Sequence, residues 1–278
     1  MEYLLLILKG MIIGVANIIP GVSGGTLMIT LGLYEEVIDT ISHFFKNFKK
    51  NLKFIIPIGI GMVLSILLLS KVISICLRDY PFPTTLFFIG LIIGGIPLLW
   101  KKTKAAKYKW SNWLVFIITF AVVLTFAFLK SGDFVVDLNS LTPIGYITLF
   151  IIGMISAATM VIPGISGSFV LMMLGYYEPI VNTIKDLTKF DLLGHNILIL
   201  APFGIGIVVG IVLVAKLIEY LLKRYPIKTY YGVLGFVLAS LVAIIKPLIG
   251  ISPSILEIII SIVLVIVGGL IAYKLGDK

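Results

Sequence analysis

Long apolar runs, separated by short polar or basic stretches, dominate the pattern of the chain. A hydrocarbon core of about 30 Å takes roughly 20 helical residues to cross, and each run is about long enough to form a helical segment of that kind. The pattern therefore predicts an all-α integral membrane protein. The apolar segments are 3–19, 25–42, 53–77, 84–100, 111–129, 143–162, 168–185, 196–222, 229–248 and 254–275.

Composition agrees with this interpretation. Of the 278 residues 60% are hydrophobic and 13% charged, and the mean hydropathy is +1.17, against roughly 45–50% and about 25% in soluble domains. A soluble enzyme, a nucleic-acid module and a disulfide scaffold are excluded. The single Cys76 excludes an intramolecular disulfide and a cysteine-rich metal site. His43 and His195 lack metal-ligand spacing and are predicted to be solvated, so we expect neither a metal nor a cofactor.

The chain contains an internal duplication. Residues 10–41 align without a gap on 153–184, and fourteen of the 32 aligned positions are identical. With a two-residue shift the match continues through Tyr80-Pro81 and Tyr225-Pro226. We interpret residues 1–278 as a single membrane domain made of two repeats, about 1–140 and about 141–278.

The first two segments of each repeat are joined without an aqueous loop. The connections, IPGVSGGT and IPGISGSF, carry no charge. Proline and glycine break a helix there, but nothing polar enough to reach bulk water interrupts the run. Each pair is therefore predicted to be a re-entrant helical hairpin, which is tolerated where irregular backbone is buried in protein or faces a cavity.

A hairpin followed by three transmembrane helices makes an odd number of crossings, so the second repeat must be inverted relative to the first. The loop charges support this topology, because the side that holds both termini has fourteen Lys and Arg and the other has five. By the positive-inside rule the termini are predicted to be cytoplasmic. The five are Arg78, Lys130, Lys185, Lys189 and Lys246.

The duplicated Pro-Gly motif is the sharpest functional signal. Free N–H groups at a helix start, flanked by hydroxyls and glycines, favour an anion, and two such tips could cradle a phosphate. The alternative is that small residues only let helices pack closely. The candidate phosphate-binding residues are Pro20, Gly21, Ser23, Gly24, Gly25 and Thr26 in the first repeat, and Pro163, Gly164, Ser166, Gly167 and Ser168 in the second.

Charged residues inside apolar segments point to function, since they are costly there. Glu35 and Glu178 occupy matched positions and could exchange protons, or could lie at the interface where the hairpin leaves the membrane. Lys71 and Lys216 are also matched and could neutralise a phosphate, or could snorkel to the interface. The basic stretch Lys101 to Lys109 is expected to contact anionic lipid and not nucleic acid.

PGVSGGT with LGLYEE, repeated as PGISGSF with LGYYEP, resembles the polyprenyl-phosphate transporter family over nearly the whole chain. The resemblance implies translocation of undecaprenyl phosphate from the outer to the inner leaflet of the bacterial plasma membrane, which recycles the lipid carrier for cell-wall synthesis. It assigns function to both Pro-Gly motifs and to Glu35 and Glu178. Many members of that family have an acidic residue where this chain has Asn17.

Two alternatives come from other classes. An undecaprenyl-pyrophosphate phosphatase is similar in its inverted repeats and re-entrant loops, but its loop carries an essential arginine where this chain has Gly24 and Gly167. Without that cation the phosphoryl transition state loses its main electrostatic stabiliser. An ion or small-solute channel is less favoured, because the segments lack a ring of charges or a filter-like repeat. Oligomeric state does not follow from the sequence.

Overall fold

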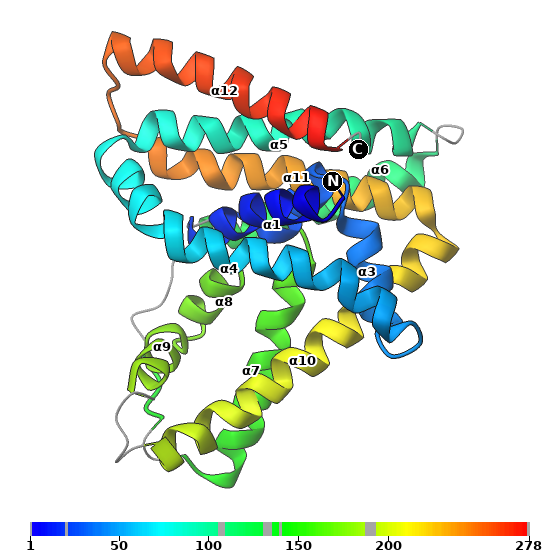
Figure 1. The fold of residues 1–278 in the computed structure, drawn as a ribbon, viewed down its shortest axis with the longest axis vertical. Coiled ribbons are helices and arrows are strands. Elements are labelled where there is room, and N and C mark those ends of the chain that lie inside the picture. Colours follow the sequence, from blue (N-terminus) through cyan, green and yellow to red (C-terminus); the bar gives the residue numbers. More distant parts are fainter. Residues whose placement is uncertain are drawn as a thin grey trace.

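The computed structural model describes residues 2–19, 22–104, 109–129, 135–138, 141–186 and 193–276, and the regular elements in these ranges are helical. The prediction of an all-helical chain is confirmed for them. The helices are α1 Glu2–Ile18, α2 Gly24–Thr30, α3 Tyr34–Ser42, α4 Phe48–Asp79, α5 Pro81–Thr103, α6 Trp110–Phe128, α7 Pro143–Val161, α8 Gly167–Met173, α9 Tyr177–Lys185, α10 Leu193–Arg224, α11 Pro226–Ile245, the 3-10 turn η3 Lys246–Leu248 and α12 Ile255–Gly276 (Figure 1).

Within the described ranges, seven helices are long and apolar enough to cross a membrane, namely α4, α5, α6, α7, α10, α11 and α12. The apolar part of α1, Tyr3–Asn17, is shorter. A helix whose apolar side chains face outward in so many places is stable only where hydrocarbon replaces water. The chain is therefore a multi-pass membrane protein.

The predicted segments 25–42 and 168–185 are each divided in two. Gly32 and Gly175 have positive φ angles of 71° and 74°. After α2, Gly32 N–H donates to Ile29 O and Leu33 N–H donates to Met28 O, and the matching bonds follow α8. This pair of bonds is the Schellman motif, which ends a helix at a left-handed glycine. The sequence pattern missed this break because apolar residues continue across it.

Two close helix pairs have the same glycines at matched positions. α1 packs against α4, and α7 packs against α10. A Cβ added at Gly61 would overlap Ile7 O, and one added at Gly206 would overlap Phe150 O. Gly61 and Gly206 thus belong to helix-packing faces. Gly59 and Gly204 do not, since an added Cβ at either would meet no atom within 4 Å.

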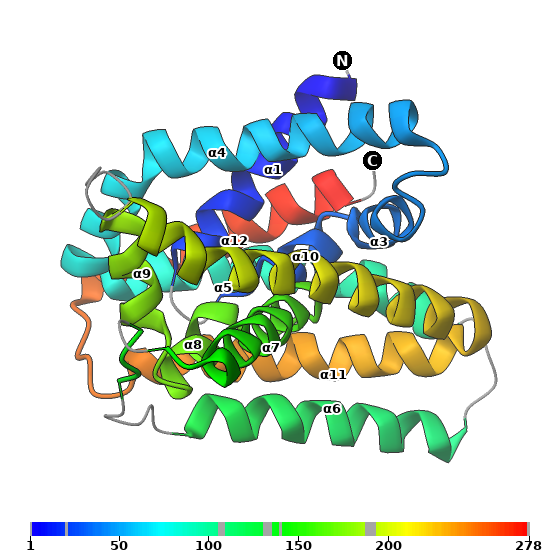
Figure 2. The same ribbon diagram turned by 90° about the horizontal axis from the view of Figure 1, so that it is seen from below.

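The remaining long helices each pack against a helix from the other half of the chain. α5 packs against α12, α11 packs against α6, and α5 also contacts α11. α12, α5 and α11 run beside one another in Figure 1, and α11 and α6 do so in Figure 2. The two labelled chain ends lie on the same side of the molecule as α3, the right-hand side in both figures.

The buried apolar side chains form clusters of unequal size. The largest cluster joins the first hairpin, α1 to α3, to α5 and α11, with Leu31 and Phe88 among its fully buried members. A smaller cluster lies within α7 to α10 and includes Leu149, Ile152 and Phe203. The second hairpin thus packs against α10 in its own half of the chain, while its tip also packs against Val123 of α6 through Ile165 and Val170.

The close contact at Gly61 gives a first prediction. Gly61→Ala should lower the free energy of unfolding by about 1–3 kcal/mol, because the new Cβ must push α4 away from α1. Thermal unfolding in detergent measures the change. Gly59→Ala on the same helix is the matched control and should leave the unfolding temperature unchanged or raise it. Equal losses in the two variants would contradict the packing role.

Candidate anion site between the two Pro-Gly motifs

The two motifs touch each other across the middle of the chain. Gly164 N–H donates to Thr26 Oγ1 at 2.9 Å, and the Tyr34 hydroxyl donates to Val161 O at 3.1 Å. Gly164 has a positive φ angle of 84°, and an added Cβ would lie 2.6 Å from Phe236 O. The sequence predicts that Pro20 and Gly21 belong to this site, but they lie outside the described residues.

The motifs are buried in protein, as irregular backbone in a membrane requires. Val22 and Ile165, at the centres of the two turns, are 3% and 8% exposed. Thr26 and Pro163 are also buried. Gly25 faces the second motif, since a Cβ there would lie 3.4 Å from Pro163 Cα. The tips are thus closed against each other.

Hydroxyl groups are presented at both turns. Ser23 is the N-cap residue of α2, is 3% exposed, and its Oγ has no hydrogen-bond partner among the described residues. Ser166 is the N-cap residue of α8 and shares a hydrogen bond of 2.8 Å with the Ser168 hydroxyl. A buried hydroxyl that lacks a hydrogen-bond partner destabilises the folded state. A polar ligand bound at Ser23 would remove this cost by supplying the missing hydrogen bond.

A cavity of about 610 Å³ begins at these hydroxyls. One part of its wall contains Ser23, Gly24, Ser166, Gly167 and Ser168. The rest is mainly apolar and comes from both hairpins and from α4 and α10. That wall contains Met28, Val37, Ile38, Ile41, Met62, Ile66, Leu171, Ile180, Val181, Ile184, Phe203, Ile207 and Ile211. The cavity is amphipathic, with neutral polar groups gathered in one region.

No lysine or arginine is among the described residues that line the cavity. Lys71 on α4 and Lys216 on α10, predicted as phosphate ligands, are both exposed and lie outside that lining. Asn17 does line it, and a Cβ at Gly24 would lie 2.6 Å from Asn17 Oδ1. In this conformation the polar region can recognise an anion through hydroxyl, amide and backbone N–H groups alone.

Glu35 lies beside the site in a network of its own. It pairs with Lys102 of α5, and the Tyr230 hydroxyl of α11 donates to its Oε1 at 2.5 Å. α3 is not one of the seven spanning helices. Burial alone would raise the pKa of Glu35, but the bonds from Lys102 and Tyr230 outweigh burial and hold that pKa below its ordinary value. The matched Glu178 is exposed.

Two polar residues acquire contacts that sequence reasoning missed. Lys9 of α1 is 4% exposed and donates to Leu31 O at 2.8 Å, at the break between α2 and α3. Its position in an apolar run, opposite Ile152 in the second repeat, is the signal that could have indicated a contact. His43 was predicted to be solvated, but its ring lies between Asp39 and Glu219. His195 is exposed.

Fold and cavity define a multi-pass helical membrane protein with an amphipathic central cavity. The chain belongs to the VCA0040-like family, whose model is described as undecaprenyl phosphate translocase-like and matches residues 13–249. A polyprenyl-phosphate transporter of Staphylococcus aureus (strain NCTC 8325 / PS 47) is 34% identical over 276 residues, which cover 97% of this chain and 95% of the relative.

A second relative, a polyprenyl-phosphate transporter of Vibrio cholerae serotype O1 (strain ATCC 39315 / El Tor Inaba N16961), is 31% identical over 255 residues. The match covers 87% of this chain and 77% of that relative. No solved structure matches the chain.

The contact between the motifs gives a second prediction. Thr26→Val removes the acceptor of the buried Gly164 N–H and should lower the free energy of unfolding by about 1–3 kcal/mol. Thr30→Val is the matched control, because the equally buried Thr30 hydroxyl only donates to Leu27 O within its own helix. Thermal unfolding in detergent should show the larger loss for Thr26→Val, and the reverse order would contradict the inference.

Proposed function

We propose that this protein carries a polyprenyl phosphate, such as undecaprenyl phosphate, across the bacterial plasma membrane from the outer to the inner leaflet, and so recycles the carrier for cell-wall synthesis. The observation that supports this most is the cavity, where the hydroxyls of both motifs meet next to an apolar wall. A phosphate head needs hydrogen-bond donors and a prenyl chain needs hydrocarbon contact, and one cavity offers both. The names of the two relatives agree with this substrate.

The proposal includes the predicted topology. We take residues 1–278 as one domain of two inverted repeats, in which α1 to α3 and α7 to α9 are re-entrant hairpins. The aligned bounds of α2 and α8, and of α3 and α9, support the repeat. The position of both chain ends on one side of the molecule supports cytoplasmic termini, because most Lys and Arg are predicted on that side. Such repeats place the substrate site at their interface.

We propose transport without hydrolysis. Gly24 and Gly167 lie in the wall of the cavity where the similar phosphatase loop has its arginine. The described lining offers no cation to stabilise a phosphoryl transition state, whereas neutral donors suffice for reversible binding. Reconstitution in liposomes with labelled polyprenyl phosphate and pyrophosphate separates the functions. Movement between leaflets without phosphate release supports the transporter, and release supports the phosphatase.

The third prediction concerns a shared anion site. Ser23→Asp and Ser166→Asp should each weaken binding of the phosphate lipid more than about tenfold, because a carboxylate repels phosphate and a hydroxyl donor is lost. Ser111→Asp, in the first turn of α6 and outside the cavity lining, is the control for added charge. Equilibrium binding in detergent measures the effect, and unchanged binding in both cavity variants would mean that the serines only pack helices.

The fourth prediction concerns coupling to the proton gradient, which we propose acts through Glu35 and Glu178. Glu35 can accept a proton readily only when Lys102 and Tyr230 move away, so its protonation should belong to a different conformation. Glu35→Gln and Glu178→Gln should flatten the pH profile of transport in liposomes and spare part of the lipid binding. Wild-type rate and pH response in both variants would end the proton-coupling proposal.

A further inference from the structure

The two hairpins are related in sequence but are packed differently. α3 of the first hairpin lies along α10, whereas α9 of the second makes no comparable contact with α4 among the described residues. The smaller apolar cluster also keeps α9 within its own half of the chain. Both α3 and α9 line the cavity, but only α3, which lies on the side of the chain ends, has close contacts with the long helix of the other repeat among the described residues.

Polar contacts hold α3 at its first turn. Tyr34 donates to Val161 O, and Glu35 joins Lys102 and Tyr230. The matched tyrosines differ in their surroundings, because Tyr34 is 7% exposed and Tyr177 is 36% exposed. The start of α3 is therefore bound to the other half of the chain, and no matching bond at the start of α9 is found among the described residues.

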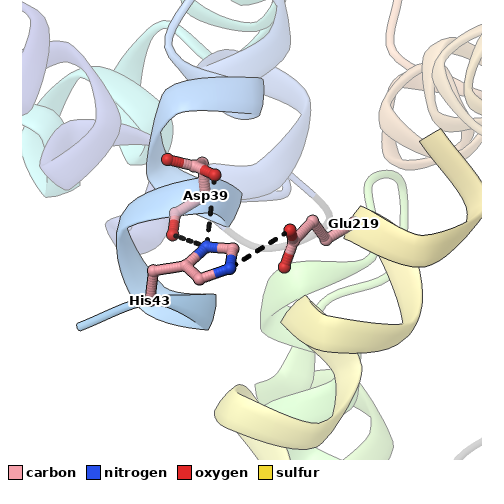
Figure 3. A group of neighbouring side chains, drawn as sticks. All are labelled: Asp39, His43 and Glu219. Carbon is pink, nitrogen blue, oxygen red and sulfur yellow. Dashed lines mark hydrogen bonds and ion pairs between the residues drawn. The ribbon is translucent and has the colours of Figure 1, made fainter. Parts of the chain in front are cut away.

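A second group of polar residues holds the last turn of α3. His43 Nδ1 lies 3.3 Å from Asp39 Oδ1, and His43 Nε2 lies 3.6 Å from Glu219 Oε1 of α10. Figure 3 shows the imidazole ring placed between the two carboxylates. Lys223, one turn further along α10, pairs with Glu219. The Glu219 side chain is only 14% exposed, so this ion pair is partly shielded from water.

The geometry favours the charged imidazolium. His43 Nδ1 faces the Asp39 carboxylate and also lies 3.3 Å from the Asp39 carbonyl, while Nε2 faces Glu219. Both ring nitrogens therefore face carboxylates, and only the protonated ring carries an N–H on both nitrogens. A metal ion is less suited to this place, because the two nitrogens point to different carboxylates and Lys223 already pairs with Glu219.

Few other charges face this group from the elements packed against α3. α2 contains no titratable residue. From α4, the neutral Asn51 donates to His43 O at 2.9 Å and to Phe44 O at 3.1 Å, which fixes the backbone after α3. The first turns of α4 also carry Lys49, Lys50 and Lys53, three exposed cations. α10 contributes Glu219 and Lys223. Of the side-chain types in this group, imidazole is the one that ordinarily changes charge between about pH 5 and about pH 8.

We propose that Asp39, His43 and Glu219 form a latch that closes the chain-terminus side of the cavity, and that loss of the His43 proton loosens it. Val37 and Ile41 of α3 line the cavity, so movement of α3 away from α10 would open the wall on that side. The proposal rests on the proposed function, since the opened wall would release or admit the phosphate lipid there.

The latch has no identical copy in the second repeat. In the repeat alignment Asp39, His43 and Glu219 correspond to Asn182, Asp186 and Ser74, so the same set of side chains is not repeated between α9 and α4. A change of pH on the side that holds the chain ends would therefore act on the closure by α3 without acting on an identical latch at α9.

The test measures access to the cavity and does not depend on transport. In a Cys76→Ser background, Ile211→Cys places a thiol in the cavity wall on α10, two turns before Glu219. A membrane-impermeant thiol reagent is added to sealed vesicles on the side that carries the chain ends. The labelling rate is divided by that of Lys104→Cys, an exposed site predicted to lie on the same side, which corrects for thiol ionisation.

The normalised labelling rate should rise about fivefold when the pH is raised from about 6 to about 8.5. A change of this size is expected from the loss of a partly exposed ion pair. His43→Gln and Glu219→Gln should give the high labelling rate at both pH values. Glu36→Gln, an exposed acid on the same helix, is the matched control and should keep the wild-type response.

Two results would overturn the latch. One is a normalised rate that is independent of pH and of both latch variants. The other is opening caused by a chelator and reversed by added zinc, which would make the cluster a metal site. A latch that responds as expected in a protein that moves no polyprenyl phosphate would instead contradict the proposed function and leave the closure mechanism intact.

Discussion

The structure depends on one constraint, which is that backbone polar groups inside an apolar environment must find partners within the protein. Each Pro-Gly turn frees such groups where no water can reach them from a loop. Here the turns satisfy part of that need together, since Gly164 N–H donates to Thr26 Oγ1. The two halves of the chain must therefore meet at their turns, and the cavity forms where they meet.

Tight packing around the turns follows from the same constraint. Long helices can approach the hairpins closely only where side chains are small, which Gly61 and Gly206 provide. The exchange of α6 and α12 between the halves then holds both hairpins against one scaffold. Because that scaffold pairs α5 with α12 and α11 with α6, the last two long helices of each half pack against helices of the other half.

Much of this organisation could be predicted from the sequence, because periodicity, repeats and helix-breaking residues are local signals. The charge-free PGVSGGT and PGISGSF turns indicated buried tips, and Val22 and Ile165 are buried. The break at Gly32 was missed, since the apolar run continues while only the backbone angle changes. The contact of His43 with Glu219 was also missed, because it joins residues far apart in the chain whose counterparts in the other repeat are different.

The contrast between Lys71 and the Pro-Gly motifs shows why matched positions in two repeats are weaker evidence for a shared site than matched surroundings. Lys71 and Lys216 align, yet both side chains are exposed, as expected of long amphipathic side chains that reach an interface. The serines align and also converge on one cavity. A cavity whose described lining offers hydroxyls and N–H groups but no lysine would hold a phosphate less tightly than a charged clamp. Weak, neutral recognition suits a protein that must release its ligand on the far side, since a ligand bound too firmly in one conformation cannot be carried through the next.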